Sequence, residues 1–160
     1  MVNYIEMQPK LLSPIIFLDC DGVINNWHTV AVNNGYRLPY VIEPDLVKRL
    51  QRFVENRNAL IVVTSTWRLT ITKEEFIQVV GGWVAFHLMI GSAWKTGRDD
   101  RGFRGNEVRN WFNDNPNFEF YKYVIFDDDS DFHSDQPFVK VNGEFGLTET
   151  DLNKARDFLR

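Results

Sequence analysis

Two aspartates, Asp19 and Asp21, follow a short apolar run near the start of the chain. The run is IIFL, residues 15–18, and it belongs to the stretch FLDCDGVIN at residues 17–25. Residues two apart in an extended chain point to the same side, so the two carboxylates would lie about 6–7 Å apart. One carboxylate can attack phosphorus while the other moves the proton of the leaving group. The spacing therefore predicts phosphoryl-transfer chemistry, with Gly22 allowing a sharp turn after the two acids.

Two other apolar runs, residues 59–64 and 123–126, also stop at residues that can bind anions or metals. These residues are Thr64, which ends the first run, Ser65 and Arg68, which follow it, and Asp127, Asp128, Asp129 and Asp131 after the second run. Ligands of an open α/β sheet bind beyond the carboxyl ends of its strands. If the three strands are parallel and adjacent, their ends would meet in one crevice.

The carboxylates of such a crevice would repel one another and raise one another's pKa. A hard divalent cation relieves this repulsion, and two or three carboxylates completed by water suit Mg2+. The metal would in turn attract an anionic substrate, most naturally a phosphate. A hydroxyl at Thr64 and a cation elsewhere in the chain would then hold the remaining phosphate oxygens.

The elements that must position these residues read as alternating strands and helices. Runs 14–18, 59–64 and 123–126 suit central strands of a parallel sheet that is buried on both faces, and residues 138–141 suit a further parallel or edge strand. Apolar residues at helical spacing begin near residues 43, 72, 106 and 148. The alternation predicts an α/β fold with a doubly wound, mostly parallel sheet.

Two segments, residues 25–42 and 81–105, fit neither pattern. The first favours a loop, a small hairpin or a flap, because Asn33-Asn34-Gly35 is a turn signal. The second is rich in glycine and arginine and would form a small lid. Neither is long enough to be a separate domain. We therefore expect a single domain over residues 1–160, with its core at about 14–160 and a minimal cap or flap.

Composition and charge limit the class of protein. The 160 residues carry a net charge of -4, which gives no support to long-range binding of polynucleotide, although Arg98, Arg101 and Arg104 indicate a local basic patch. The N-terminus lacks the pattern of a secretion signal, and no apolar run approaches the roughly 20 residues that span a bilayer. Cys20, the single cysteine, excludes an internal disulfide and is expected to face the core. We therefore expect a cytoplasmic protein without a membrane partner.

The motifs and their order resemble those of the haloacid dehalogenase (HAD) superfamily. FLDCDGVIN, IVVTSTWR and YVIFDDDSDF look like its motifs I, II and IV, and RGNEVRNWF stands where its basic motif III would fall. With GLTETD, the pattern is similar to a small branch related to Swiss-army-knife RNA-repair proteins and to the phosphatase half of phage polynucleotide kinase-phosphatase. The resemblance implies a HAD-like Rossmannoid fold over most of the chain.

The resemblance also implies a role for each matching acid. Asp19 would be the nucleophile and a Mg2+ ligand. Asp21 would be the general acid and base, and its backbone carbonyl would also bind the metal. Asp127 and Asp128 would hold Mg2+ directly or through water, and Asp131 matches a later acid of the same motif.

The phosphate-binding positions leave alternatives open. Thr64 would bind the phosphate by resemblance, and Ser65 is its rival because the strand end is uncertain by one residue. The family usually places a lysine in motif III, and no lysine occurs in residues 96–121. The candidates to replace it are, in order, Arg104, Arg68 and Lys95.

The prediction from the residues and the resemblance is a Mg2+-dependent phosphomonoester hydrolase that forms an aspartyl-phosphate. The resemblance favours the phosphate of a nucleotide or of a nucleic-acid end as substrate. One alternative is a phosphatase of small metabolites such as sugar phosphates. Another is a non-catalytic module that binds Mg2+ and phosphate, since fold does not fix function. The sequence leaves the oligomeric state open.

Overall fold

The computed structural model describes residues 12–34 and 39–160, so residues 1–11 and residues 35–38 of the predicted flap lie outside the described part. Its four strands form one sheet in the order β2-β1-β3-β4, and each neighbouring pair is parallel. The strands are β1 (Ile15–Leu18), β2 (Leu60–Val63), β3 (Tyr123–Asp127) and β4 (Phe138–Lys140). This arrangement confirms the doubly wound α/β prediction, with β4 at one edge of the sheet.

The register of the sheet brings three strand ends to one level. The chain leaves β1 towards β2 on one side and later returns as β3 on the other, so the strand order reverses beside β1. Leu18 pairs with Val63 and with Phe126. The residues that follow these three positions therefore stand side by side at the carboxyl edge, where doubly wound sheets bind their ligands.

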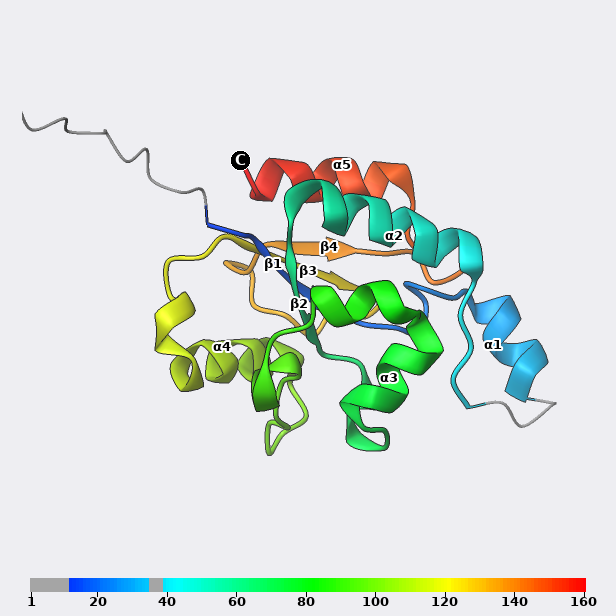
Figure 1. Cartoon of the computed structure of the whole chain (residues 1–160), viewed down its shortest axis with the longest axis horizontal. Coiled ribbons are helices and arrows are strands. Elements are labelled where there is room, and N and C mark those ends of the chain that lie inside the picture. Colours follow the sequence, from blue (N-terminus) through cyan, green and yellow to red (C-terminus); the bar gives the residue numbers. More distant parts are fainter. Residues whose placement is uncertain (1–11, 35–38) are drawn as a thin grey trace, which may run out of the picture.

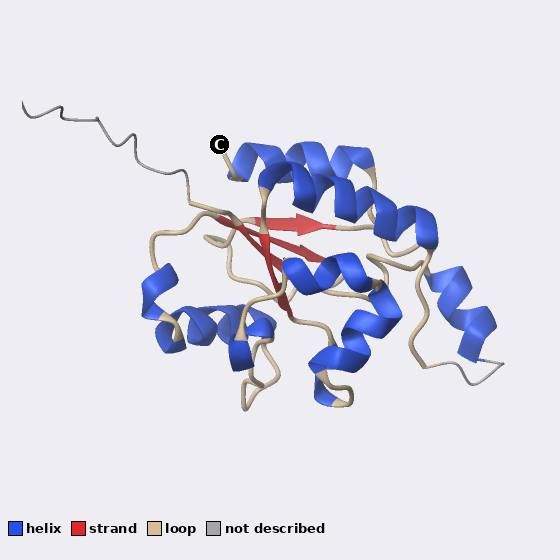
Figure 2. Cartoon of the chain, viewed as in Figure 1, coloured by secondary structure: helices blue, strands red, loops and turns tan. Residues whose placement is uncertain are grey.

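Helices cover both faces of the sheet (Figures 1 and 2). They are α1 (Trp27–Asn34), α2 (Pro44–Arg57), α3 (Lys73–Val80), α4 (Arg104–Asp114) and α5 (Glu149–Phe158). Alternate β1 residues enter different apolar clusters, because successive side chains of a strand point to opposite faces. Ile16 and Leu18 pack with residues of α2, α3 and α5, whereas Ile15 and Phe17 pack with Val108 of α4. The result is a sheet that is buried on both sides.

Two of the predicted helix starts are closed by capping boxes. The Thr72 hydroxyl accepts a hydrogen bond from the Glu75 amide at 3.1 Å, and the Glu75 carboxylate accepts one from the Thr72 amide at 2.7 Å. Thr148 and Asp151 form the same reciprocal pair at the start of α5. These bonds satisfy amides that have no partner inside the helix.

The structure corrects the prediction of a loop or hairpin after the first motif, because residues 27–34 form α1. The Asn26 side chain accepts a hydrogen bond from the Thr29 amide at 2.9 Å and so caps this helix. The Trp27 amide donates to the Gly143 carbonyl at 2.8 Å, which ties the helix start to the turn after β4. The turn residue Gly35 lies outside the described residues.

The segment predicted as a lid begins with two short 3-10 helices, η2 (Gly82–Phe86) and η3 (Gly91–Trp94). Residues 87–96 run along the outer side of β2. The Ile61 amide donates to the His87 carbonyl at 2.8 Å, the Met89 amide donates to the Ile61 carbonyl at 3.1 Å, and the Thr96 amide donates to the Val63 carbonyl at 3.1 Å. A lid function for residues 81–105 stays a prediction.

Within residues 12–34 and 39–160, no helix is both long enough and apolar enough to cross a membrane.

Candidate active site

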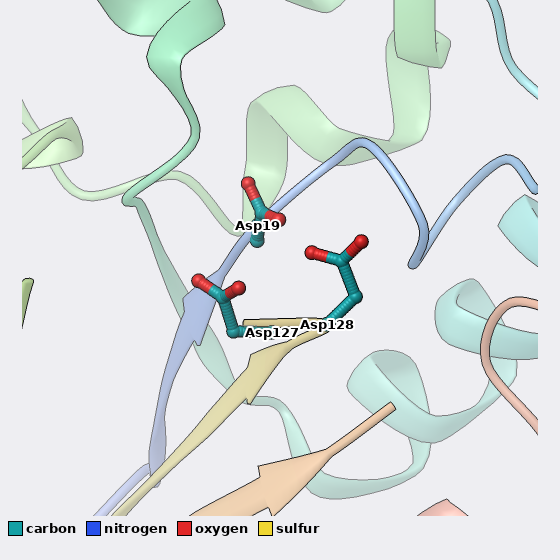
Figure 3. Close-up of side chains that lie close together, drawn as sticks. All are labelled: Asp19, Asp127 and Asp128. Atoms are coloured by element: carbon teal, nitrogen blue, oxygen red, sulfur yellow. The ribbon is translucent and has the colours of Figure 1, made fainter. Parts of the chain in front are cut away.

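Three aspartates form an acidic cluster at the carboxyl edge of the sheet. Asp19 follows β1, Asp127 ends β3 and Asp128 is the next residue. One carboxylate oxygen of each lies within 4.8 Å of the other two. Figure 3 shows the three side chains gathered close together beyond the ends of the two strands. Asp19 and Asp127 are buried, whereas Asp128 is partly exposed.

Negative charge on the acidic cluster is unfavourable, because its carboxylates are close together and two of them are buried. Burial, followed by the neighbouring charge of Asp127, raises the pKa of Asp19 well above its usual range. Burial also raises the pKa of Asp127 to about 6, against the opposing effect of Arg104. Removing a carboxylate from water disfavours its charged form, and a second carboxylate nearby adds to the cost. Three such oxygens form a donor set that suits a hard divalent cation.

Arg104, the first residue of α4, provides the positive charge next to this cluster. Its Nη1 atom lies 3.5 Å from Oδ1 of Asp19 and forms a hydrogen-bonded ion pair with Asp127. Burial acts to lower the pKa of Arg104, but the charges of Asp19 and Asp127 outweigh it and raise that pKa. The Arg104 amide donates to Oδ2 of Asp131 at 3.2 Å, so this predicted acid fixes the start of α4.

Arg68 lies in the interior rather than among the acids. Its guanidinium donates to the carbonyl oxygens of Ser65 at 3.0 Å and Thr96 at 2.9 Å, and to the Glu107 carboxylate at 2.9 Å. Burial lowers its pKa, although Glu107 opposes this effect. These contacts join the residues after β2 to α4. A phosphate-binding role for Arg68 stays a prediction, as does one for Lys95, whose Nζ donates to the Arg68 carbonyl at 3.2 Å.

The two hydroxyls after β2 differ in what they bind. The Ser65 hydroxyl accepts a hydrogen bond from the Trp67 amide at 3.3 Å and so caps the short 3-10 helix η1 (Thr66–Leu69). The buried Thr64 hydroxyl has no hydrogen-bond partner among the residues that the structure describes. The Thr64 amide donates to the Leu18 carbonyl at 2.9 Å, which places Thr64 level with the acidic cluster. A phosphate-binding role for either hydroxyl stays a prediction.

Asp21 is half-buried and is held by two side chains that the sequence patterns did not single out for this role. Asn25 donates to its Oδ1 atom at 2.9 Å, and the Trp67 indole donates to its Oδ2 atom at 3.1 Å. Asn25 also accepts from the Gly22 amide at 2.8 Å, so it fixes the turn as well as the acid. Asn25 and Trp67 are both buried. The sequence pointed to these two residues only through their positions in the motifs FLDCDGVIN and IVVTSTWR.

Asp128 has two close neighbours of its own. The Trp27 indole donates to its Oδ2 atom at 3.1 Å. Gly22 has a φ of +78°, and a Cβ atom at this position would lie 2.3 Å from the same oxygen. A residue with a side chain would therefore strain the backbone and displace the carboxylate. The close approach of Asp128 therefore explains why the first motif needs a glycine at this position.

A cavity of about 240 Å3 opens beside Arg104, and its lining includes Thr66, Arg98 and Asp131. Two larger cavities have volumes of about 610 and 810 Å3. None of the three is lined by a clustered aspartate, and we assign the smallest to the site because Arg104, which lines it, contacts both Asp19 and Asp127.

Cys20 lies between the two motif-I acids but is fully buried in the apolar cluster that contains Ile16 and Leu18. Burial raises the pKa of its thiol well above the usual range. A thiol that stays protonated is a poor nucleophile. The placement agrees with the prediction that this cysteine faces the core.

The comparisons with known proteins yield one match. The family model described as the HAD domain in Swiss Army Knife RNA repair proteins matches residues 15–152. The matched range runs from β1 into α5 and contains the three strand ends and all of the clustered acids. No curated protein and no solved structure matches the chain. The family match confirms the resemblance inferred from the motifs.

Proposed function

Because the chain belongs to the family of HAD domains in Swiss Army Knife RNA repair proteins, we propose that it is a Mg2+-dependent phosphomonoester hydrolase that works through an aspartyl-phosphate. The family supports a phosphatase-type hydrolase in the context of RNA repair. The observation that carries the proposal is the meeting of Asp19, Asp127 and Asp128 within 4.8 Å at the carboxyl edge of the sheet. The substrate is the phosphate of a nucleotide or of a nucleic-acid end.

The acidic cluster fits a divalent cation, because two of its three carboxylates, Asp19 and Asp127, are buried and the pKa of both is raised. Asp19, Asp127 and Asp128 would hold the ion through their carboxylates, and Asp21 through its backbone carbonyl. When bound, Mg2+ neutralises negative charge on the phosphate and orients it for in-line attack.

Side chains of the protein carry out the nucleophilic attack, the proton transfers and the binding of the phosphate. A carboxylate oxygen of Asp19 attacks phosphorus, the bond from phosphorus to the leaving oxygen breaks, and the Asp21 carboxyl gives its proton to that oxygen. Asp21 then takes a proton from water, which attacks phosphorus and releases inorganic phosphate from Asp19. The Thr64 hydroxyl and the Arg104 guanidinium bind phosphate oxygens while negative charge spreads over them. Arg104 suits a purely electrostatic role, since a guanidinium keeps its proton.

The test is hydrolysis of a generic aryl phosphate with Mg2+ by the wild-type chain and by Asp19→Asn. We expect the variant to lose activity by several orders of magnitude, because the amide cannot attack phosphorus. Asp157→Asn is a matched control at an exposed acid of α5, whose side chain is 67% exposed. Unchanged turnover by Asp19→Asn would exclude the mechanism.

A substrate panel then separates the substrate classes. It contains 3'-phosphorylated oligonucleotides, mononucleotides and sugar phosphates. Equal or better activity on sugar phosphates would favour a phosphatase of small metabolites. Mg2+ binding without hydrolysis of any member would favour a non-catalytic module.

A further inference from the structure

Trp27 lies beside the acidic cluster and is not used by the mechanism above. It is the first residue of α1, and its indole N–H donates to Oδ2 of Asp128 at 3.1 Å. Asp128 in turn lies within 4.8 Å of Asp19, measured between carboxylate oxygens. One side chain therefore separates the indole from the proposed nucleophile.

The Trp27 side chain is held in place by contacts with Gly143. The Trp27 amide donates to the Gly143 carbonyl at 2.8 Å. A Cβ atom on Gly143 would lie 2.0 Å from Nε1 and 2.3 Å from Cε2 of the indole, so the ring packs directly on the glycine backbone. The edge of the ring is fixed by Asp128 and its inner side by Gly143.

About half of the Trp27 surface is nevertheless open to solvent. Trp27 is 55% exposed although its single polar atom is satisfied by Asp128. Trp27 thus presents a large apolar surface that is held in place and exposed at the edge of a polar site. Binding a ligand over such a surface is favourable, because it removes apolar area from water. Aromatic rings of nucleobases stack on such a surface with little dependence on sequence.

We propose that Trp27 is a stacking platform for the base of the substrate, and that it selects phosphomonoesters carried by a nucleoside with an unpaired base. The inference rests on the proposed function, because it takes the scissile phosphate to lie at Asp19. A nucleotide would place its phosphate at Asp19 and its base over the indole, on opposite sides of Asp128. A sugar phosphate has no aromatic ring and gains nothing from this surface.

The tether to Asp128 gives the same side chain a second effect, and two variants separate the two. Trp27→Phe keeps an aromatic face but removes the N–H that binds Asp128. Trp27→Ala removes both. A loss shared by the two variants reports on Asp128, whereas a loss confined to Trp27→Ala and to substrates with a base reports on stacking.

The experiment measures kcat/KM of the full chain with Mg2+ for ribose 5-phosphate, nucleoside 3'- and 5'-monophosphates and a 3'-phosphorylated single-stranded oligonucleotide. We expect Trp27→Ala to lower kcat/KM for the substrates with a base about tenfold or more beyond its effect on ribose 5-phosphate, which is the size of one base–aromatic stack. Trp27→Phe should keep most of the preference. A larger loss on the oligonucleotide identifies a strand end, and an equal loss identifies a free nucleotide; both support the platform.

Phe120→Ala is the matched control. Phe120 is 85% exposed and borders the cavity lined by Pro14 and Lys122, which precede β1 and β3 at the opposite edge of the sheet. This substitution should leave the nucleotide preference unchanged. Equal losses on ribose 5-phosphate and on nucleotides in Trp27→Ala would overturn the proposal while leaving phosphatase activity in place.

If no phosphoester is hydrolysed and the proposed function fails, measuring the binding of a nucleotide still tests the stacking platform. Calorimetric titration of Asp19→Asn with a nucleoside monophosphate and Mg2+ gives a Kd that does not depend on turnover. Adding Trp27→Ala to this variant should weaken that Kd about tenfold. An unchanged Kd would overturn the proposal.

Discussion

Each oxygen of the Asp21 carboxyl group accepts a hydrogen bond from a buried side chain, one from Asn25 and one from Trp67. A carboxylate oxygen has about two lone pairs, so each keeps capacity for a proton or a ligand. The two donors therefore fix the direction of the acid without blocking it. At the scale of single residues, the candidate site therefore includes side chains that orient its acids as well as the acids themselves.

Trp67→Phe should reduce kcat while the fold stays intact. The change keeps an aromatic ring in the core but removes one donor to Asp21, so proton transfer loses part of its roughly 10²- to 10⁴-fold contribution. We expect kcat to fall about tenfold and the free energy of unfolding to fall by about 1 kcal/mol. Steady-state kinetics and urea unfolding measure the two effects.

Trp111→Phe is the matched control for this experiment. Trp111 is also buried, and its indole donates to the Ala93 carbonyl at 2.9 Å on the other face of the sheet. It should show a similar loss of stability with unchanged kcat. Equal kcat values for the two variants would remove the orienting role of Trp67.

Thr64→Val should separate binding of phosphate from stability. The Thr64 hydroxyl is buried without a partner among the described residues, so an apolar group of the same shape should leave the free energy of unfolding unchanged or higher. Loss of a hydrogen bond to a charged phosphate should lower kcat/KM about tenfold or more. Ser65→Ala should instead cost about 1 kcal/mol of stability through its helix cap. The reverse pattern in kinetics and thermal melts would assign the phosphate to Ser65.

At the scale of elements, a buried ion pair fastens the residues after β2 to α4. The side chains of Arg68 and Glu107 are 2% and 5% exposed, and Nη2 of Arg68 lies 2.9 Å from Oε2 of Glu107. Arg104 starts the same helix, so the pair sets the position of the guanidinium that faces the acidic cluster. Removing one partner of a buried pair leaves an uncompensated charge in the interior.

Glu107→Ala should lower the free energy of unfolding by about 3–5 kcal/mol, because Arg68 would remain buried and unpaired. Urea unfolding measures the change. Asp135→Ala provides the comparison, since Asp135 pairs with Arg109 at 2.8 Å but the two side chains are 70% and 48% exposed. We expect that substitution to cost less than about 1 kcal/mol. Similar costs for the two variants would contradict the structural role of the buried pair.

The elements also show which parts of the site the sequence could predict. The acids stand directly after apolar runs, and parallel strands carry their ends to one edge, so Asp19 and Asp127 could be placed together from the chain alone. The contacts from Trp67 to Asp21 and from Trp27 to Asp128 join residues 46 and 101 positions apart. No local pattern encodes such contacts. Helix α1 was missed because its cap, Asn26, sits inside a segment that otherwise reads as a turn.

At the scale of the whole molecule, a cation that binds the folded cluster should stabilise the entire fold. The unfolded chain does not bring Asp19, Asp127 and Asp128 together, so binding acts on the native state alone. At 100 times Kd, Mg2+ should add about 2.7 kcal/mol to the free energy of unfolding. Melting curves with Mg2+ and with a chelator measure this increment.

Asp127→Asn should lose most of the increment from Mg2+, whereas Asp157→Asn on α5 should keep it. An increment that is the same in wild type and in Asp127→Asn would place the cation elsewhere.

Residues 87–96 occupy the side of β2 on which a strand of another molecule could add. The unpaired amides and carbonyls of an exposed outer strand invite such pairing and lead to aggregation. Here the amide and carbonyl of Ile61 and the carbonyl of Val63 are already taken by this segment. The segment reaches β2 at two short stretches with η3 between them, so it offers no continuous ladder to a second chain. While the chain folds, β2 is protected only after this segment has docked, which makes that docking step a safeguard against intermolecular association.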